Sequence, residues 1–191
     1  MNTLQQSLNT AIDLRMQLLS NQDFQDNFYA CVDQIEAAFK ADKKLLLCGN
    51  GGSAGDAQHI AAELSGRFLL DRSPLFAEAL HVNTSYLTAV ANDYGYDEVY
   101  ARMTEAMGRA GDVLIGLSTS GNSKNVLKAL QKAKSLGMVT VAFLGENKGE
   151  MGKLADYVIQ IPSSNTARIQ ELHITIGHVL CEELEQRLFA K

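Results

Sequence analysis

The positions of apolar residues divide the chain into two unequal parts. Over residues 2–42, apolar side chains recur at helical spacing, which predicts two helices. The first predicted helix carries an apolar stripe formed by Leu4, Leu8, Ala11, Ile12 and Leu19. The second carries a more regular one, formed by Phe24, Phe28, Cys31, Val32, Ile35 and Phe39. Both helices therefore need an apolar partner, which is either the rest of the chain or another subunit.

From Lys44 onward, short apolar runs alternate with helical stretches. The runs, each a predicted strand, are residues 45–48, 77–82, 112–118, 138–144 and 157–161. The predicted helices are residues 53–67, 84–91, 97–107, 123–136 and 165–189. Strand, loop and helix repeated in this way are typical of a parallel sheet with helices on both faces. We expect an α/β fold, a three-layer α-β-α sandwich around a central five-stranded parallel sheet, with the N-terminal helices added to it.

The loop after the first predicted strand is a candidate ligand loop, because such sheets bind ligands at the carboxyl ends of their strands. It consists of Asn50, Gly51, Gly52 and Ser53, and a helix follows directly. Glycines let the backbone turn sharply and present N–H groups, and Ser53 can act as an N-cap or contact a ligand. An ordinary tight turn explains the loop equally well. It is neither a GxGxxG fingerprint nor a P-loop, so it gives no support for nucleotide binding.

The loop after the third predicted strand is rich in hydroxyl groups and also runs into a helix. The hydroxyl groups belong to Ser118, Thr119, Ser120 and Ser123. Hydroxyl and free N–H groups at a helix N-terminus, without Lys or Arg, form a neutral cradle that suits a phosphate monoester. A capping cluster is the alternative interpretation. Two such loops on adjacent strand ends favour phosphate binding.

Candidate acid/base residues lie on two of the predicted helices. His59 and Glu63 are four residues apart and share one helix face, which Arg67, a candidate substrate contact, continues. A histidine and a carboxylate so placed can bind a metal or share proton transfer, although a solvated surface pair is the commoner case. His178 lies in the mostly apolar last helix, so it is either a core residue or a functional one.

Three other polar features are less informative. Asn92 and Asp93 follow the short predicted helix 84–91, and they could hydrogen-bond sugar hydroxyls or form an Asx turn. His81 and His173 have no neighbour that suggests chemistry, and we interpret them as structural.

Composition excludes several classes of protein. The chain has 191 residues, of which 46% are hydrophobic and 20% charged, so it is not disordered. Its net charge of −5, from 17 basic and 22 acidic residues, argues against nucleic acid as a partner. Its three cysteines are scattered without CxxC spacing, which suits a reducing cytoplasm. Without a signal peptide or a long apolar span, no membrane association is expected.

Four stretches of the chain resemble the sugar isomerase (SIS) domain family, and within it the phosphoheptose isomerases. They are LLCGNGGSAGDAQHIAAELSGRF (46–68), VAND (90–93), GDVLIGLSTSGNS (111–123) and ARIQELHI (167–174), with His178 beyond the last. The resemblance covers essentially the whole chain. It implies a flavodoxin-like SIS domain over residues 43–191 that binds a sugar phosphate, and a helical extension over residues 1–42 that packs in the oligomer. It also implies a homotetramer with active sites near subunit interfaces.

The resemblance further implies roles for particular residues. It implies substrate contacts from Asn50, Gly51, Gly52, Ser53, Glu63, Asn92, Asp93 and Gln170, and phosphate contacts from Ser118, Thr119, Ser120 and Ser123. It implies Glu63 and His178 as the acid/base pair, and one zinc ion per subunit held by His59, Glu63, Gln170 and His178. Gln170 is the weakest of these ligands, because amide oxygen is uncommon on zinc and eight helical residues, about 12 Å of rise, separate it from His178.

The implied activity is the conversion of sedoheptulose 7-phosphate to D-glycero-D-manno-heptose 7-phosphate, the first step toward heptose precursors of lipopolysaccharide or surface polysaccharide. A carboxylate base such as Glu63 and an acid such as His178 suit proton transfer through an enediolate. Two alternatives remain. Some SIS proteins are non-catalytic tetramers that bind the bacterial replication initiator, but the presence of Glu63 and His178 favours an enzyme. The same loops would also serve an isomerase of a shorter phosphosugar.

Overall fold

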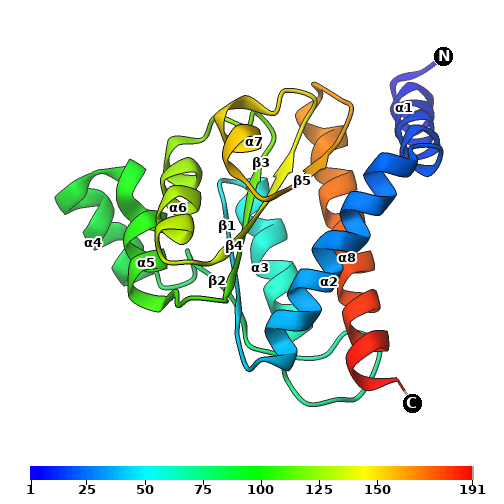
Figure 1. Ribbon diagram of the computed structural model, residues 1–191. Coiled ribbons are helices and arrows are strands. Elements are labelled where there is room, and N and C mark those ends of the chain that lie inside the picture. Colours follow the sequence, from blue (N-terminus) through cyan, green and yellow to red (C-terminus); the bar gives the residue numbers. More distant parts are fainter. Residues whose placement is uncertain (191) are drawn as a thin grey trace.

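The computed structural model describes residues 1–190, which form a five-stranded parallel sheet between two layers of helices (Figure 1). The strands are β1 (Leu45–Gly49), β2 (Ala77–Ala79), β3 (Val113–Ser118), β4 (Val139–Leu144) and β5 (Tyr157–Gln160). They are arranged in the order β2-β1-β3-β4-β5, and every neighbouring pair is parallel. This is the flavodoxin-like order. The predicted α/β sandwich is confirmed.

The helices agree with the predicted ones to within a few residues, with two differences. They are α1 (Thr3–Leu19), α2 (Gln22–Lys40), α3 (Gly52–Ser65), α4 (Thr84–Tyr94), α5 (Val99–Met107), α6 (Lys124–Ser135), α7 (Gly149–Leu154) and α8 (Thr166–Phe189). The short helix α7 has no predicted counterpart, and a 3₁₀ turn, η1 (Tyr96–Glu98), precedes α5. The edge strand β2 is shorter than its apolar run, because the chain turns away after Ala79.

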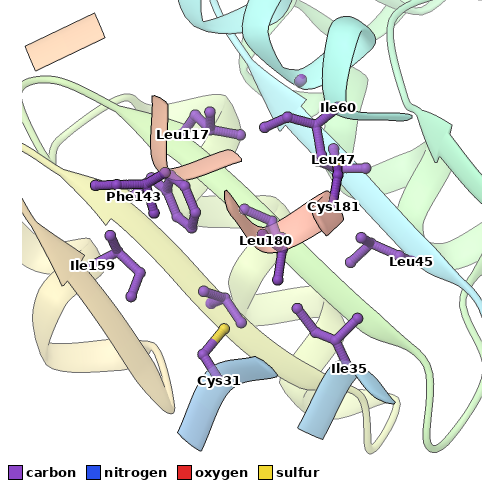
Figure 2. Packing of buried hydrophobic residues seen from close by; sticks show 14 of the residues in the cluster. Cys31, Ile35, Leu45, Leu47, Ile60, Leu117, Phe143, Ile159, Leu180 and Cys181 are labelled. Atoms are coloured by element: carbon purple, nitrogen blue, oxygen red, sulfur yellow. The ribbon is translucent and has the colours of Figure 1, made fainter. Parts of the chain in front are cut away.

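Alternate residues of the strands face two separate hydrophobic cores. Leu45 and Leu47 of β1 face the core that β1 shares with α2, α3 and α8, whereas Leu46 and Cys48 face the core shared with α5 and α6. Figure 2 shows the first core, where side chains of α2, α3 and α8 converge on the sheet. Because both faces are covered, the strands read as continuous apolar runs rather than as alternating ones.

The two N-terminal helices find their apolar partners to different degrees. In α2, Phe28, Val32 and Ile35 are buried in the core of the same chain. In α1 one side packs inward, but a second apolar stripe lies on the surface, each side chain between 55% and 69% exposed. This α1 stripe consists of Leu4, Leu8, Ile12, Met16 and Leu19. Among residues 1–190, no helix is long and apolar enough to cross a membrane.

His173 lies in the core, as its interpretation as a structural residue requires. Its side chain is fully buried, its ring meets that of Phe143 edge-on at 5.6 Å, and its Nε2 donates to the carbonyl oxygen of Leu144 at 3.3 Å. Burial lowers the pKa of His173 to about 4, and the bond to Leu144 opposes this only in part. The neutral imidazole is therefore the form that the folded protein stabilises.

We expect His173 to make the stability of the fold depend on pH. The pKa of an unfolded histidine is about 6.5, so between that pH and about 4 the unfolded chain binds more protons than the folded one. Stability therefore falls as the pH falls, and His173 should account for about 2 kcal/mol between pH 7 and pH 5. Urea denaturation at the two pH values measures this. His173→Gln keeps an N–H donor but does not titrate, so the variant should lose less stability between pH 7 and pH 5, by that amount. Equal losses of stability in the wild type and the variant would show that His173 does not cause the pH dependence.

Candidate functional site

The two predicted ligand loops lie side by side at one edge of the sheet. β1 pairs with β2 on one side and β3 on the other, so the strand order reverses direction there, which is the place where such sheets bind ligands. The register pairs Gly49 with Leu117, so the two strands end together. The loop after β1 and the loop after β3 are therefore neighbours, as the prediction of a shared site requires.

The loop after β1 depends on its glycines. Gly51 adopts a φ of +55° and occupies the N-cap position of α3, where no side chain caps the helix. A Cβ atom at Gly49 would lie 2.6 Å from the carbonyl oxygen of Ser53, so a larger residue there would collide with the first turn of α3. Ser53 itself is buried and is not the N-cap. The backbone N–H groups at the start of α3 are thus left without a side-chain cap.

A pair of amides joins the two loops, and one of its members was not predicted. Asn50 Nδ2 donates to Asn125 Oδ1 at 2.9 Å, and Asn125 Nδ2 donates back to Asn50 Oδ1 at 2.8 Å. Tyr96 donates its hydroxyl proton to the same Asn50 oxygen at 3.2 Å. Asn125 is buried, in the first turn of α6. It therefore holds the Asn50 side chain in one orientation across the mouth of the two strands.

The hydroxyl groups of the second loop gather together. Ser118 Oγ lies 2.9 Å from Ser123 Oγ and 3.4 Å from Ser120 Oγ. Ser123 is the N-cap residue of α6, but its side chain makes no capping bond to the helix. Gly121, with a φ of +68°, provides the turn that brings the hydroxyls together. The loop thus presents hydroxyl groups beside the positive end of a helix dipole, an arrangement that suits an anion.

The candidate acid/base residues form a cluster between two helices. Glu63 Oε1 lies 3.0 Å from His59 Nε2, both on α3, and His178 Nε2 of α8 lies 3.1 Å from the same nitrogen. The helices pack closely here because residue 177 is glycine: a Cβ atom there would lie 2.5 Å from the Cδ1 atom of Ile60. The two helices approach so closely that residues 119 positions apart in the sequence contact one another.

The donor atoms of this cluster fit a metal ion. One atom from each of His59, Glu63 and His178 lies within 4.8 Å of the other two. A tetrahedral zinc ion with bonds of about 2.0–2.1 Å keeps its ligand atoms about 3.3 Å apart, close to the contacts observed. Two histidines and one carboxylate are also a donor set found in catalytic zinc sites. The cluster is half-buried, with the His59 side chain 48% exposed, so solvent and small molecules can reach it.

Two further side chains border the cluster. The ring of Phe68 stacks on that of His178, with centroids 5.7 Å apart and planes at 17°. Asp56, one turn before His59 on α3, has a buried Oδ2 atom without a hydrogen-bond partner among residues 1–190. Burial raises the pKa of the Asp56 carboxyl to about 6, although the nearby His59 lowers it. Sequence inspection missed both residues, since neither belongs to a recognisable pattern.

The structure places Gln170 beside the first loop. A Cβ atom at Gly52 would lie 2.6 Å from Gln170 Nε2, so the amide packs directly on the start of α3. A position beside the first loop suits the contact with substrate that is suggested for Gln170. Its suggested role as a metal ligand stays a prediction.

Two expectations about helix ends are wrong. α3 ends at Ser65, so Arg67 does not continue the face of His59 and Glu63; its side chain is exposed beyond the helix. Asn92 and Asp93 lie in the last turn of α4 rather than in a loop, and Asn92 Nδ2 donates to Asp93 Oδ1 at 2.9 Å. Both mistakes follow from helix ends that the apolar pattern marks poorly. The substrate contacts suggested for these three residues stay predictions.

Comparison with known proteins places the chain among a group of isomerases. The SIS domain family matches residues 8–145. The phosphoheptose isomerase of Clostridium acetobutylicum is 45% identical over 190 residues, which cover 100% of this chain and 97% of that protein. The solved structure of a phosphoheptose isomerase from Neisseria gonorrhoeae, 38% identical, matches with a TM-score of 0.88 over 96% of this chain and 100% of the other. The solved structure of a phosphoheptose isomerase from Francisella tularensis, 31% identical, matches with a TM-score of 0.91 over 97% of this chain and 100% of the other.

We expect the amide pair between the two loops to contribute measurably to stability. A double-mutant cycle with Asn50→Ala, Asn125→Ala and the double variant isolates their interaction, and urea denaturation gives each free energy of unfolding. Two hydrogen bonds that shield each other from water should give a coupling of about 1–2 kcal/mol. Additive effects of the two single substitutions would show that the loops are not joined through this pair.

Proposed function

Since the chain belongs to the SIS-domain family of phosphoheptose isomerases, we propose that it converts sedoheptulose 7-phosphate to D-glycero-D-manno-heptose 7-phosphate. The observation that carries the proposal is the contact of Glu63, His59 and His178 at the junction of α3 and α8. Conversion of a ketose to an aldose needs a base and an acid close together, and this cluster supplies both.

Proton transfer is assigned to Glu63 and His178. In the proposed reaction Glu63 takes a proton from C1 of the substrate and returns it to C2, while His178 moves the proton between the two oxygens. Glu63 contacts His59 through Oε1, so its second oxygen is the one assigned to the carbon-bound proton. Half-burial keeps both groups within reach of a substrate that enters from solvent.

Binding of the sugar phosphate is assigned to the two loops at the strand ends. Ser118, Thr119, Ser120 and Ser123 hold the phosphate through hydroxyl and backbone N–H groups, aided by the dipole of α6. The loop from Asn50 to Gly52 binds the sugar, with the Asn50 amide held in place by Asn125. The gathering of the three serine hydroxyls supports this assignment, as does the absence of a side-chain capping bond at the N-cap positions of α3 and α6.

One zinc ion per chain is part of the proposal, held by His59, Glu63 and His178, with Gln170 as the fourth ligand that the family resemblance suggests. The donor spacing and the His-Glu-His set support it. When bound, zinc stabilises negative charge on substrate oxygens as a Lewis acid.

The proposed setting is cytoplasmic synthesis of heptose precursors for surface polysaccharide. Cys31, Cys48 and Cys181 are free and buried, as suits a reducing compartment. Burial raises the pKa of the Cys31 thiol to about 12, so this cysteine stays an unreactive core residue.

We expect metal-stripped protein to regain turnover of sedoheptulose 7-phosphate when zinc is added back. In the same assay Glu63→Gln, which keeps the shape of the side chain but removes the base, should lower kcat by about 10²–10⁴ with little change in KM. Turnover by the metal-stripped protein without added zinc would support the isomerase activity but contradict the role of zinc.

Two other outcomes would change the assignment. A preference for a shorter ketose phosphate, assayed in competition, would overturn the heptose assignment. No turnover with any ketose phosphate would overturn the enzyme and favour a non-catalytic binding protein.

We also propose that the chain forms a homo-oligomer, a tetramer by family resemblance. The exposed α1 stripe supports this, as does a groove of about 350 Å³ between α1, α2 and α8. The groove is lined largely by apolar side chains, including Phe24, Tyr29 and Val179. The family resemblance further suggests that the active sites lie near the subunit interfaces. Within residues 1–42 the exposed face is thus assigned to assembly, while α2 also packs in the core of the same chain; residues 43–191 are assigned to sugar-phosphate binding.

We expect a charge in the α1 stripe to dissociate the oligomer. Light scattering of the wild type should give about four times the chain mass of 20.8 kDa, and Leu8→Lys should give a smaller species with unchanged helix content by circular dichroism. Gln6→Lys, on the exposed polar side of the same helix, is the matched control. A wild-type monomer, or a Leu8→Lys variant that assembles normally, would contradict the assigned interface.

A further inference from the structure

The acid/base cluster is divided between two helices, so its geometry depends on how those helices are held. His59 and Glu63 lie on α3 and His178 on α8. At the level of the cluster, Gly177 allows the close approach but does not by itself fix the rotation of one helix against the other. A second connection lies two turns further along, where a buried ion pair joins the same helices.

The first member of this pair is Glu185 of α8. It follows His178 by seven residues, which is two turns or about 10 Å along the same face of the helix. Its side chain is only 1% exposed, yet its oxygens accept four hydrogen bonds of 2.8–2.9 Å: from the backbone N–H groups of Phe68, Leu69 and Leu70, and from Arg72 Nε. Such full compensation is what a buried carboxylate requires.

The charge of this carboxylate is maintained by its surroundings. Burial by itself raises the pKa of Glu185, but the backbone N–H groups of Leu70, Phe68 and Leu69 and the Arg72 guanidinium together bring it below its ordinary value. Glu185 is therefore ionised near neutral pH, and all four of its hydrogen bonds are strengthened by charge.

The second member, Arg72, ties the pair to α3. Its side chain is 2% exposed, and besides Glu185 it donates to the last turn of α3: Nη1 to the carbonyl oxygen of Leu64 at 2.7 Å and Nη2 to that of Glu63 at 2.9 Å. The end of α3 leaves these carbonyl groups without partners inside the helix, and the Leu64 carbonyl also accepts from the backbone N–H of Leu75 at 3.0 Å. One planar guanidinium thus joins the end of α3 to α8, a geometry that an ammonium group cannot reproduce.

The same pair also holds the aromatic ring that covers His178. The segment whose N–H groups bind Glu185 begins at Phe68, and the Phe68 ring stacks on the imidazole of His178. Glu185 therefore acts on the cluster twice: through Arg72 it holds α3, and through the backbone of Phe68 it holds the ring against His178.

We propose that Arg72 and Glu185 are positioning residues that set the α3–α8 geometry of the His59–Glu63–His178 cluster. The catalytic consequence rests on the proposed function, but the positioning itself does not. Neither residue touches substrate or metal in this assignment. Their effect is to hold three side chains from two helices in one arrangement before any ligand binds.

Ring resonances of ¹³C-labelled histidine test the proposal without metal or substrate. In Arg72→Lys and Glu185→Gln, the resonances of His59 and His178 should move, because the helices shift or rotate. His81, in the turn after β2, lies on neither helix, so its resonances serve as the internal control and should stay. Unmoved His59 and His178 resonances in folded variants would overturn the proposal.

Arg187→Lys is the matched control variant. Arg187 lies on the same helix and also makes ion pairs, but with Asp33 and Glu36 of α2 rather than with α3. The substitution removes a similar fork from α8 without touching the α3 connection, so the histidine resonances should not move. Movement equal to that in Arg72→Lys would show a general loosening of α8 and overturn the specific role.

A milder variant covers the case in which the buried pair is needed for folding. Phe68→Leu keeps the pair and removes only the stacked ring, and zinc affinity, measured by competition with a chelator, should fall about ten- to a hundred-fold. Unchanged zinc affinity would overturn the role of the Phe68 segment.

The outcomes also separate the positioning from the proposed function. If the wild type is inactive but the resonances of His59 and His178 shift in Arg72→Lys, only the proposed function is refuted. If the wild type is active but those resonances do not move, only the positioning is refuted.

Discussion

Parallel pairing of β1 with β3 is the constraint on which the candidate site depends. It brings two loops that are about 70 residues apart to one edge of the sheet, each at the start of a helix. Both strands are buried on both faces, so their register cannot slip without moving apolar side chains out of two cores. The Asn50–Asn125 pair then joins the first loop to the start of α6, the helix that follows the second loop. A rigid core thus positions loops whose own residues are small and polar.

The packing of α3 on α8 is the second constraint, and it couples the core to the chemistry. On the inner side Ile60 and Leu180 belong to the hydrophobic core (Figure 2). On the outer side the same two helices bring His59 and His178 into contact. The close approach of α3 and α8 at Gly177 therefore also allows the contact between His59 and His178. The glycine at 177 is where this coupling is tightest.

Two apolar surfaces of the chain nevertheless remain exposed to solvent. The α1 stripe and the groove beside Val179 leave apolar area in water that a monomer would not be expected to leave. In contrast, the buried charges of Arg72 and Glu185 are satisfied within the chain. The proposed assembly would cover the apolar N-terminal face, whereas the ion pair proposed to position the acid/base cluster lies within one chain.

The sequence by itself determined the alternation of strands and helices, the two candidate ligand loops and the pairing of His59 with Glu63, because these are local patterns of burial, turn chemistry and helical spacing. Contact of His178 with His59 was only suggested by family resemblance, since it joins residues far apart in the chain. The Asn125 amide and the Arg72–Glu185 pair were not foreseen at all. Their partners are chosen by how strands and helices pack, and the tertiary structure alone decides which distant polar groups meet in a buried place.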